Sequence, residues 1–361
     1  MTKREASGIA FILQDELGAT LAQKFASQGR DVIAFVQPNP DAEVVDLGTV
    51  LRASSIADAL DGRSLVFTLL QTAQDVEDIY LGTDGVLQSS SDNSYFVDLS
   101  TSSPRLAREL HALAAVHDSY FVDAALEGDS TAVARGEARA FVGGETDILA
   151  VVLPLIDELV GSSVTTGLPG TGAAARLATL IAQTGNLLAF VEGLAFAQQA
   201  GIENSALLRL LGEGQSTNAA VELFGAQILA EDYYGGTRIR RYFRDLSTAL
   251  DAAEELDLTL PGLETAYQLY DLLALVGGNA MGAHALSLIY QNEDYCAKYG
   301  LDWELAQRAM DVYDHDDYGD YSDCDDCDDP DCGSHPHHHH HHDHREGDDS
   351  LPGMGGFFSS N

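Results

Sequence analysis

Short apolar runs recur through the first part of the chain, and polar or glycine-rich breaks separate them. The runs of strand type lie at residues 8–13, 31–36, 64–70, 94–100, 119–125 and 138–144. Segments with helical spacing lie between several of them, at 16–28 and 104–116. Strands that alternate with helices predict a mostly parallel, doubly wound sheet, and right-handed connections place its helices on both faces.

The pattern changes after about residue 165, where the runs of strand type end. Helical spacing then fills the chain, over residues 172–200, 203–213, 216–230, 241–257, 262–276 and 282–291. We therefore predict an α/β fold with an N-terminal sheet domain over residues 1–166 and an all-α domain over residues 167–308. Two domains also agree with the length of 361 residues.

One helical segment, from about residue 170 to 200, contains no proline and almost no charge. As a single helix of about 30 residues it would span ~45 Å and join the two domains. Apolar residues cover most of its circumference, which predicts burial on both sides. A polar line at helical spacing interrupts them, at Arg176, Thr179, Gln183 and Asn186. This line is either a set of satisfied core residues or the wall of a cleft between the domains.

The charge of the chain excludes one class of partner. Acidic residues number 57 and basic residues 19, the formal net charge is −38, and lysine occurs only at positions 3, 24 and 298. So acidic a surface repels phosphates, and we expect no nucleic-acid partner. The composition fits adaptation to high salt, or an acidic tail on an acidic cytosolic protein.

The apolar runs do not predict a targeting or membrane segment. The N-terminal run is short and meets Gln14, Asp15 and Glu16, unlike a signal peptide. The long helix carries Gln183, Asn186 and Glu192 within its apolar part, so we predict no membrane span. We expect a soluble, cytoplasmic protein without a membrane partner.

The last part of the chain has a composition of its own. Residues 311–349 hold fifteen acids, one Arg and nine of the twelve histidines, so they cannot bury enough apolar surface to order themselves. We predict a disordered acidic, His-rich tail over residues 309–361. Thiolates and imidazoles bind Zn, Ni or Co, and the candidate metal ligands are Cys324, Cys327, Cys332, His335, His337, His338, His339, His340, His341, His342 and His344. The alternatives are a solvated acidic tail or, in part, an affinity tag.

Six phrases occur in an order and spacing typical of one enzyme family. They are IAFILQDELGATLAQKFASQG near the N-terminus, LGTDGVL at 81–87, VDLSTSSPRLAREL at 97–110, FVDAALEGDSTAVARGEARAFVGG at 121–144, GLPGTGAAAR at 167–176 and FRDLSTALDAAEELDLTLP at 243–261. Together they resemble the β-hydroxyacid dehydrogenase family, which includes 3-hydroxyisobutyrate dehydrogenase, tartronate semialdehyde reductase and, more distantly, the imine reductases. The resemblance covers about residues 8–292.

The resemblance implies a fold, a cofactor and an assembly. The sheet domain would be a Rossmann-type domain, followed by the long interdomain helix and a 6-phosphogluconate dehydrogenase-like all-α domain. NAD or NADP would be the cofactor, a small molecule the substrate, and the all-α domain would form a homodimer. The implied site residues are Leu13, Gln14, Gly18, Ser100, Thr101 and Arg244 for the cofactor, Glu127, Gly128 and Asp129 for the substrate, and Arg176 and Thr179 for catalysis.

Three departures from the family pattern bear on the chemistry. The first two glycines of the Gly-x-Gly-x-x-Gly turn are Leu13 and Asp15 here, although the second normally lets the backbone approach the pyrophosphate. A carboxylate about 4 Å from a phosphate charge would oppose binding by ~4 kcal/mol at an effective dielectric of 20. Residues 13–18 therefore form either a dinucleotide-binding turn or a plain strand-to-helix turn without a ligand.

The other two departures lie in the substrate and catalytic phrases. Glu127 replaces a serine that holds an anionic substrate in the family, and Arg176 replaces the catalytic lysine. Arginine stays protonated, so it is a poor proton donor but a good charge stabiliser. Because the family places these two positions across one cleft, we predict an ion pair between Glu127 and Arg176.

Two functions follow from these observations. The first is an oxidoreductase that moves a hydride between NAD(P) and a small hydroxy acid, carbonyl or imine, with Arg176 stabilising the developing oxyanion. The second is a catalytically impaired binding or scaffold protein with a metal-chelating tail.

Overall fold

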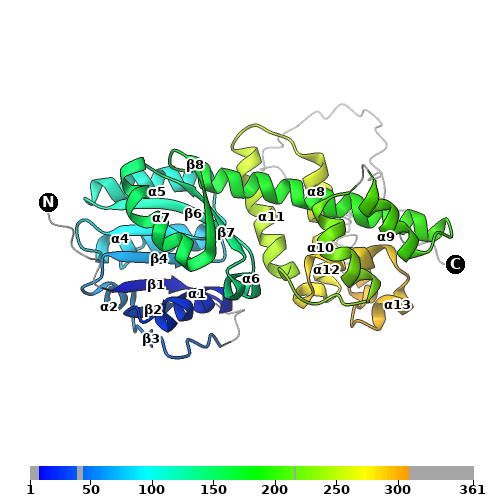
Figure 1. Ribbon diagram of the computed structural model, residues 1–361, viewed down its shortest axis with the longest axis horizontal. Helices are drawn as coiled ribbons and strands as arrows, with labels where there is room; N and C mark the ends of the chain where they lie inside the picture. The colour runs from blue at the N-terminus through cyan, green and yellow to red at the C-terminus, as the bar shows by residue number, and fades with distance from the viewer. Residues whose placement is uncertain (1–7, 39–43, 215–216, 309–361) are drawn as a thin grey trace, which may run out of the picture. The chain divides into compact units, whose positions relative to one another are not determined.

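The computed structural model describes residues 8–38, 44–214 and 217–308, and its N-terminal part is built on one sheet. Eight strands lie in the order β3-β2-β1-β4-β5-β6-β7-β8 (Figure 1). They are β1 Ile9–Leu13, β2 Val32–Val36, β3 Leu51–Arg52, β4 Leu65–Leu69, β5 Tyr95–Asp98, β6 Tyr120–Glu127, β7 Ala138–Gly143 and β8 Gly161–Gly167. All neighbours are parallel except β6 and β7, which confirms the mostly parallel sheet.

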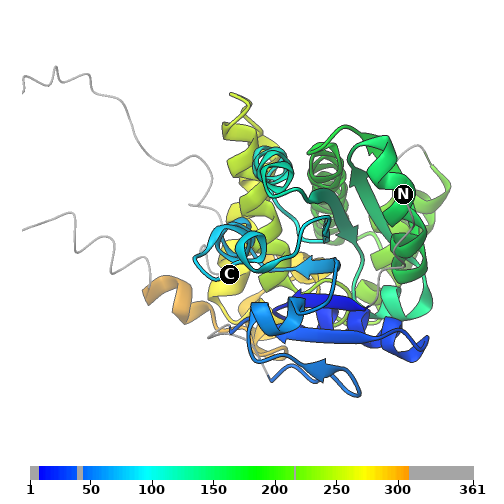
Figure 2. The ribbon, with the colours of Figure 1, turned by 90° about the vertical axis from the view of Figure 1, so that its left-hand side faces the viewer.

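Helices cover both faces of this sheet (Figures 1 and 2). They are α1 Glu16–Ser27, α2 Ile56–Leu60, α3 Ala73–Leu81, α4 Val86–Ser89, α5 Pro104–Val116, α6 Ser130–Arg135 and α7 Thr146–Val160. Successive residues of a strand point to opposite faces. Accordingly Phe11 packs into the core under α1 and α7, whereas Ile12 packs into the core on the other face.

The second half of the described chain is helical, as predicted. Its elements are α8 Thr171–Gln199, α9 Asn204–Glu213, α10 Ala219–Leu229, α11 Ile239–Glu254, α12 Pro261–Leu275, η1 Gly278–Ala280, η2 Ala283–Tyr290 and α13 Glu293–Ala297. They enclose a third core, in which Tyr270 and Leu246 are fully buried. The segment 282–291, predicted as an α-helix, forms the 3₁₀ helix η2 over most of its length.

The long helix exists, but its predicted burial on both sides is wrong. Helix α8 packs on the sheet domain near its start and on the all-α core through Phe190 and Leu194. Its other side is open, with Gln183 and Asn186 exposed and Phe196 76% exposed. By length and composition alone α8 could cross a membrane, which is weak evidence because core helices share these properties.

The apolar runs did not predict two of the eight strands, β3 and β8. Strand β8 has the sequence GSSVTTG and pairs with β7 at the edge of the sheet. Its residues are mostly exposed, so they carry no apolar run that a pattern could detect. A glycine-rich segment, residues 167–172, connects β8 to the start of α8. The predicted disordered tail lies outside the described residues.

Candidate active site

The strand order reverses between β1 and β4, and the candidate site begins there. In doubly wound folds ligands bind outside the carboxyl ends of the strands at this reversal. Gln14 follows β1, and its side-chain Oε1 accepts a 2.7 Å hydrogen bond from the backbone N–H of Gln71, which follows β4. The Oε1 of Gln71 in turn accepts from Nη1 of Arg244 on α11. Hydrogen bonds thus connect the ends of two strands to the all-α domain.

The turn between β1 and α1 keeps the packing role of its last glycine. A Cβ on Gly18 would lie 2.6 Å from the Cβ of Leu13, so a larger residue would push α1 off the sheet. Asp15 is the N-cap of α1, and its Oδ1 accepts from the N–H of Gly18 at 3.0 Å. Its Oδ2 lies 3.9 Å from Nη1 of Arg241. The carboxylate of Asp15 therefore caps α1 with one oxygen and faces Arg241 with the other.

A cavity of about 400 Å³ opens beside this turn. Its wall combines the start of α1, the segment Gly128–Thr131 after β6, and the start of α11 with the loop before it. Four arginines line it: Arg238, Arg240, Arg241 and Arg244. Only Arg244 follows from the family resemblance. The sequence signal for the others is RIRRYFR, a basic run in a chain of net charge −38.

The predicted ion pair between Glu127 and Arg176 does not form. Strands β6 and β7 are antiparallel, and their register places Arg139 directly opposite Glu127. Nη2 of Arg139 lies 2.6 Å from Oε2 of Glu127, and Nε2 of Gln183 donates to its other oxygen at 2.6 Å. Both oxygens of the Glu127 carboxylate therefore have partners other than Arg176.

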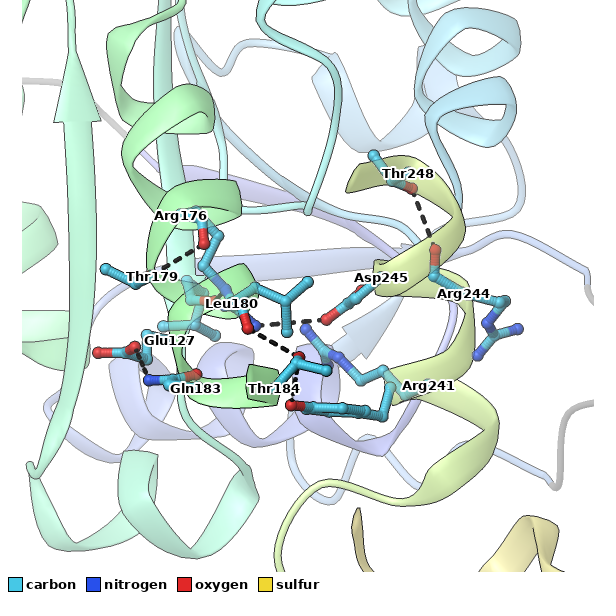
Figure 3. A network of polar contacts seen from close by, with 12 residues as sticks. Glu127, Arg176, Thr179, Leu180, Gln183, Thr184, Arg241, Arg244, Asp245 and Thr248 are labelled. Atoms are coloured by element: carbon cyan, nitrogen blue, oxygen red, sulfur yellow. Dashed lines mark hydrogen bonds and ion pairs between the residues drawn. The ribbon is translucent and has the colours of Figure 1, made fainter. Parts of the chain in front are cut away.

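Arg176 is held instead between the two domains (Figure 3). Its Nε donates to the carbonyl oxygen of Leu126 at 3.2 Å, and its Nη2 lies 3.4 Å from Oδ2 of Asp245 on α11. The side chains of Arg176 and Asp245 are 8% and 4% exposed. Thr179 Oγ1 donates to the carbonyl oxygen of Arg176, so it is engaged within its own helix.

Two hydroxyl groups follow β5, on Ser100 and Thr101, and only that of Ser100 is hydrogen-bonded within the described residues. Ser100 Oγ accepts from the N–H of Leu70 at 2.9 Å and donates to Oδ1 of Asp98 at 2.6 Å. Burial raises the pKa of Asp98, while hydrogen bonds from Ser100 and Thr68 oppose that rise. Thr101 Oγ1 is buried and has no hydrogen-bond partner among the described residues.

Arg176 and Arg244 also have a buried polar atom that lacks a hydrogen-bond partner among the described residues. Nη1 of Arg176 and Nε of Arg244 are buried and have no partner within the described part of the chain. Buried polar groups are normally hydrogen-bonded, and each exception needs an explanation. Three predicted site residues, Thr101, Arg176 and Arg244, therefore each keep a buried donor or hydroxyl without a partner among the described residues.

Two predicted substrate-binding residues, Gly128 and Asp129, have structural roles in the turn after β6. Gly128 has φ +136°, and a Cβ there would lie 3.0 Å from the Cβ of Ala138, so glycine is required. Asp129 is the N-cap of α6 and accepts from the N–H of Ala132 at 2.8 Å. Both residues also line the cavity, whereas Glu127 does not.

Asp123 is a buried acid that the sequence did not single out for function. Its carboxylate accepts from the N–H groups of Gly170 at 2.8 Å and Ala173 at 3.0 Å, and so caps α8 from the sheet. Burial raises the pKa of Asp123 to about 6, although these N–H groups oppose the rise. Gly172 allows this approach, because a Cβ there would lie 2.5 Å from the carbonyl oxygen of Phe141.

Among residues 8–38, 44–214 and 217–308, no group of three or more His, Cys, Asp or Glu side chains could hold a metal ion. The predicted metal ligands, from Cys324 to His344, lie outside these residues.

Comparisons with known proteins agree with the two-domain architecture. Residues 8–167 match the NAD binding domain of 6-phosphogluconate dehydrogenase, and residues 170–289 match the NAD-binding domain of NADP-dependent 3-hydroxyisobutyrate dehydrogenase. A probable mitochondrial 3-hydroxyisobutyrate dehydrogenase-like protein of Arabidopsis thaliana is 29% identical, over 78% of this chain and 84% of its own. The 2-hydroxy-3-oxopropionate reductase of Escherichia coli is 28% identical, over 77% and 95% of the two chains.

A solved structure supports the fold. The structure of Mycobacterium tuberculosis 3-hydroxyisobutyrate dehydrogenase with L-serine aligns with a TM-score of 0.71 at 22% identity, covering 80% of this chain and 100% of that one.

Proposed function

The chain belongs to the β-hydroxyacid dehydrogenase family, and from this premise we propose that it is an NAD(P)-dependent oxidoreductase acting on a small hydroxy acid, carbonyl or imine. The relatives are oxidoreductases of the 3-hydroxyisobutyrate dehydrogenase type, which favours this function over the binding or scaffold alternative. The observation that carries the proposal is a set of three buried polar atoms, on Thr101, Arg176 and Arg244, that have no partner among the described residues.

The residues present fit a phosphate-bearing dinucleotide, but in a way that differs from the glycine-rich turn. Leu13 is buried in the core and Asp15 takes the N–H of Gly18, so two of the three glycine positions no longer receive a phosphate. The cavity beside them carries four guanidinium groups. Thr101 and the arginines of the cavity, Arg238, Arg240, Arg241 and Arg244, would hold the cofactor, which when bound supplies or accepts the hydride.

Arg176 would act on the substrate as a fixed cation. Its guanidinium is positioned by Leu126 and Asp245, and Nη1, which has no partner within residues 8–38, 44–214 and 217–308, can donate to a substrate oxygen. A preorganised donor of this kind stabilises negative charge that develops on a carbonyl oxygen. Because arginine stays protonated, the cation acts by charge and not by giving up its proton.

A titration of the full chain with NADPH and with NADH tests this function. Trp303 is the only tryptophan of the chain, so its fluorescence reports on one position and calorimetry should accompany it. We expect saturable binding of at least one cofactor, measured at low and at high salt because screening changes with ionic strength. Absence of binding at millimolar concentrations of both cofactors would contradict the proposal.

We also propose a homodimer through the all-α domain. Large apolar side chains are exposed on three consecutive helices, with Phe196 of α8 76% exposed, Leu210 of α9 60% and Leu223 of α10 65%. Large exposed apolar patches mark association sites. Sedimentation of the full chain should give a dimer, and a monomer at micromolar concentration would contradict it.

Three expectations complete the proposal. We propose a cytoplasmic protein without nucleic-acid or membrane partners, on the grounds of its acidity. We also propose that the tail from Cys324 to His344 binds Zn, Ni or Co, since it is rich in thiols and imidazoles. Calorimetric titration with Zn should give binding in the full chain and none in a chain that ends at residue 310.

A further inference from the structure

The start of helix α11 reverses the charge balance of the protein. Across the whole chain acids outnumber bases by 57 to 19, yet the cavity carries four arginines against three acids, Asp15, Glu16 and Asp129. We call Arg238, Arg240, Arg241 and Arg244 the α11 arginine cluster. A cleft lined with one sign of charge concentrates ligands of the opposite sign.

The positions of these arginines at the N-terminus of α11 are unfavourable for the stability of the helix. Arg238 is the N-cap of α11, Arg240 and Arg241 are in its first turn, and no acidic residue is in that turn. The N-terminus of a helix carries a partial positive charge, which disfavours cations there. Arg238, Arg241 and Arg244 also recur at i, i+3 and i+6, a spacing at which like charges repel. A segment that breaks local rules in this way is expected at a functional site.

Charge within the protein compensates the cluster only in part. Arg241 has Asp15 as a partner at 3.9 Å, which is the outer range of an ion pair. Arg238 is exposed and has no ion pair among the described residues. Nε of Arg244 is buried and finds no partner in the part of the chain that the structure describes. Burial, together with Arg240 and Arg241, lowers the pKa of its guanidinium. Repulsion inside the cluster therefore remains for an anion to relieve.

We propose that the α11 arginine cluster is a pyrophosphate-binding site and takes over the role of the missing glycine-rich turn. This inference rests on the proposed function, because the ligand is the phosphate-bearing part of the dinucleotide. Asp15 already takes the N–H of Gly18, so a phosphate at the start of α1 would lose that donor and would meet a carboxylate. The cavity joins that same turn to α11, so a phosphate near Asp15 meets guanidinium groups in place of backbone amides. Planar guanidinium groups bind phosphate oxygens in bidentate geometry.

Asp15 acts in this site as an internal competitor for Arg241. An arriving phosphate and the Asp15 carboxylate both require that guanidinium, so removal of the carboxylate charge strengthens binding. Asp15→Asn keeps an oxygen that can accept from Gly18, since asparagine is also a good N-cap. This substitution therefore separates the charge of residue 15 from its structural role.

Calorimetric titration of the full chain tests the inference, with inorganic pyrophosphate, NADPH and NADH as probes. Loss of one charge-assisted hydrogen bond from Arg238→Gln or Arg241→Gln should weaken pyrophosphate binding about tenfold or more. Asp15→Asn should strengthen it. Arg209→Gln is the matched control, because Arg209 is exposed on α9 and does not line the cavity. Circular dichroism melts confirm that each variant folds.

The probes separate this inference from the proposed function. If pyrophosphate binds through the cluster but neither dinucleotide binds, the site stands with a phosphorylated small molecule as its ligand, and the cofactor proposal fails. If NADPH or NADH binds equally well to Arg238→Gln, Arg241→Gln and the natural chain, the cluster inference is overturned while the cofactor proposal survives. Absence of pyrophosphate binding at millimolar concentration also overturns the inference.

Discussion

Arg176 of α8 and Asp245 of α11 form a buried ion pair with Nη2 and Oδ2 3.4 Å apart. The pair joins the interdomain helix to the helix that carries the arginine cluster. Arg176 also binds the carbonyl oxygen of Leu126 at the end of β6, so one guanidinium connects the sheet, α8 and α11. Arg176 stands where the family resemblance implies a catalytic lysine, and in this chain it is a buried cation that holds the two domains together.

Asp245→Asn should destabilise the protein strongly. The substitution leaves the charge of Arg176 buried without a counterion, and breaking a buried pair costs about 3–5 kcal/mol. Chemical denaturation at fixed salt would measure the loss. A double variant, Arg176→Met with Asp245→Leu, is the control, because replacing both partners with apolar groups is often neutral. A single variant as stable as the natural chain would show that the pair is solvated.

Arg176→Lys should restore a titratable acid at the site. General acid catalysis contributes about 10²–10⁴-fold, so we expect turnover to rise by about 10²-fold if the lysine reaches the substrate. The rate should also fall at high pH, as the lysine loses its proton, whereas the natural chain should show no such limb. The measurement is NADPH or NADH oxidation with a small semialdehyde across pH. Equal profiles for both proteins would place the rate-limiting proton transfer elsewhere.

Glu127→Gln should change stability by only about 0–1 kcal/mol. The carboxylate of Glu127 pairs with Arg139, whose side chain is 44% exposed, and solvent-exposed pairs of this kind contribute little. The glutamine can still accept from Gln183. Thermal denaturation measures the change, with Arg139→Gln as the companion variant that removes the other partner. A loss as large as that of Asp245→Asn would mean that Glu127 compensates Arg176 after all.

The sequence predicted the fold because its signals are local. Strands β1, β2 and β4 to β7 have apolar runs, and the helix of about 30 residues has helical spacing, so both can be predicted without knowledge of their neighbours. Strand β8 has no such pattern, because an exposed edge strand such as GSSVTTG needs only its hydrogen bonds to β7. Its existence depends on the edge of the sheet that the rest of the chain builds.

The pairing of charges within the site could not be predicted in the same way. The family resemblance led us to expect Arg176 and Glu127 across one cleft. In the structure the register of β6 with β7 places Arg139 opposite Glu127, and Asp245 of α11 pairs with Arg176. Register and helix packing are tertiary properties. The basic run RIRRYFR is visible in the sequence, but only the structure shows that its four arginines line one cavity.

Asp123 should make stability depend on pH in a direction opposite to most acids. Its pKa is raised from 3.8 to about 6, so between these values the folded state binds the proton more tightly than the unfolded state. The contribution of Asp123 to stability is therefore greatest below about pH 4 and declines as the pH rises to about 6, by about 3 kcal/mol in total. Asp123→Asn removes this titration, so the free energy of unfolding of the natural chain minus that of the variant should fall across this window. Denaturation at fixed salt and several pH values measures the difference, and a difference that rises with pH would mean that the N–H groups of Gly170 and Ala173 outweigh the burial of the carboxylate.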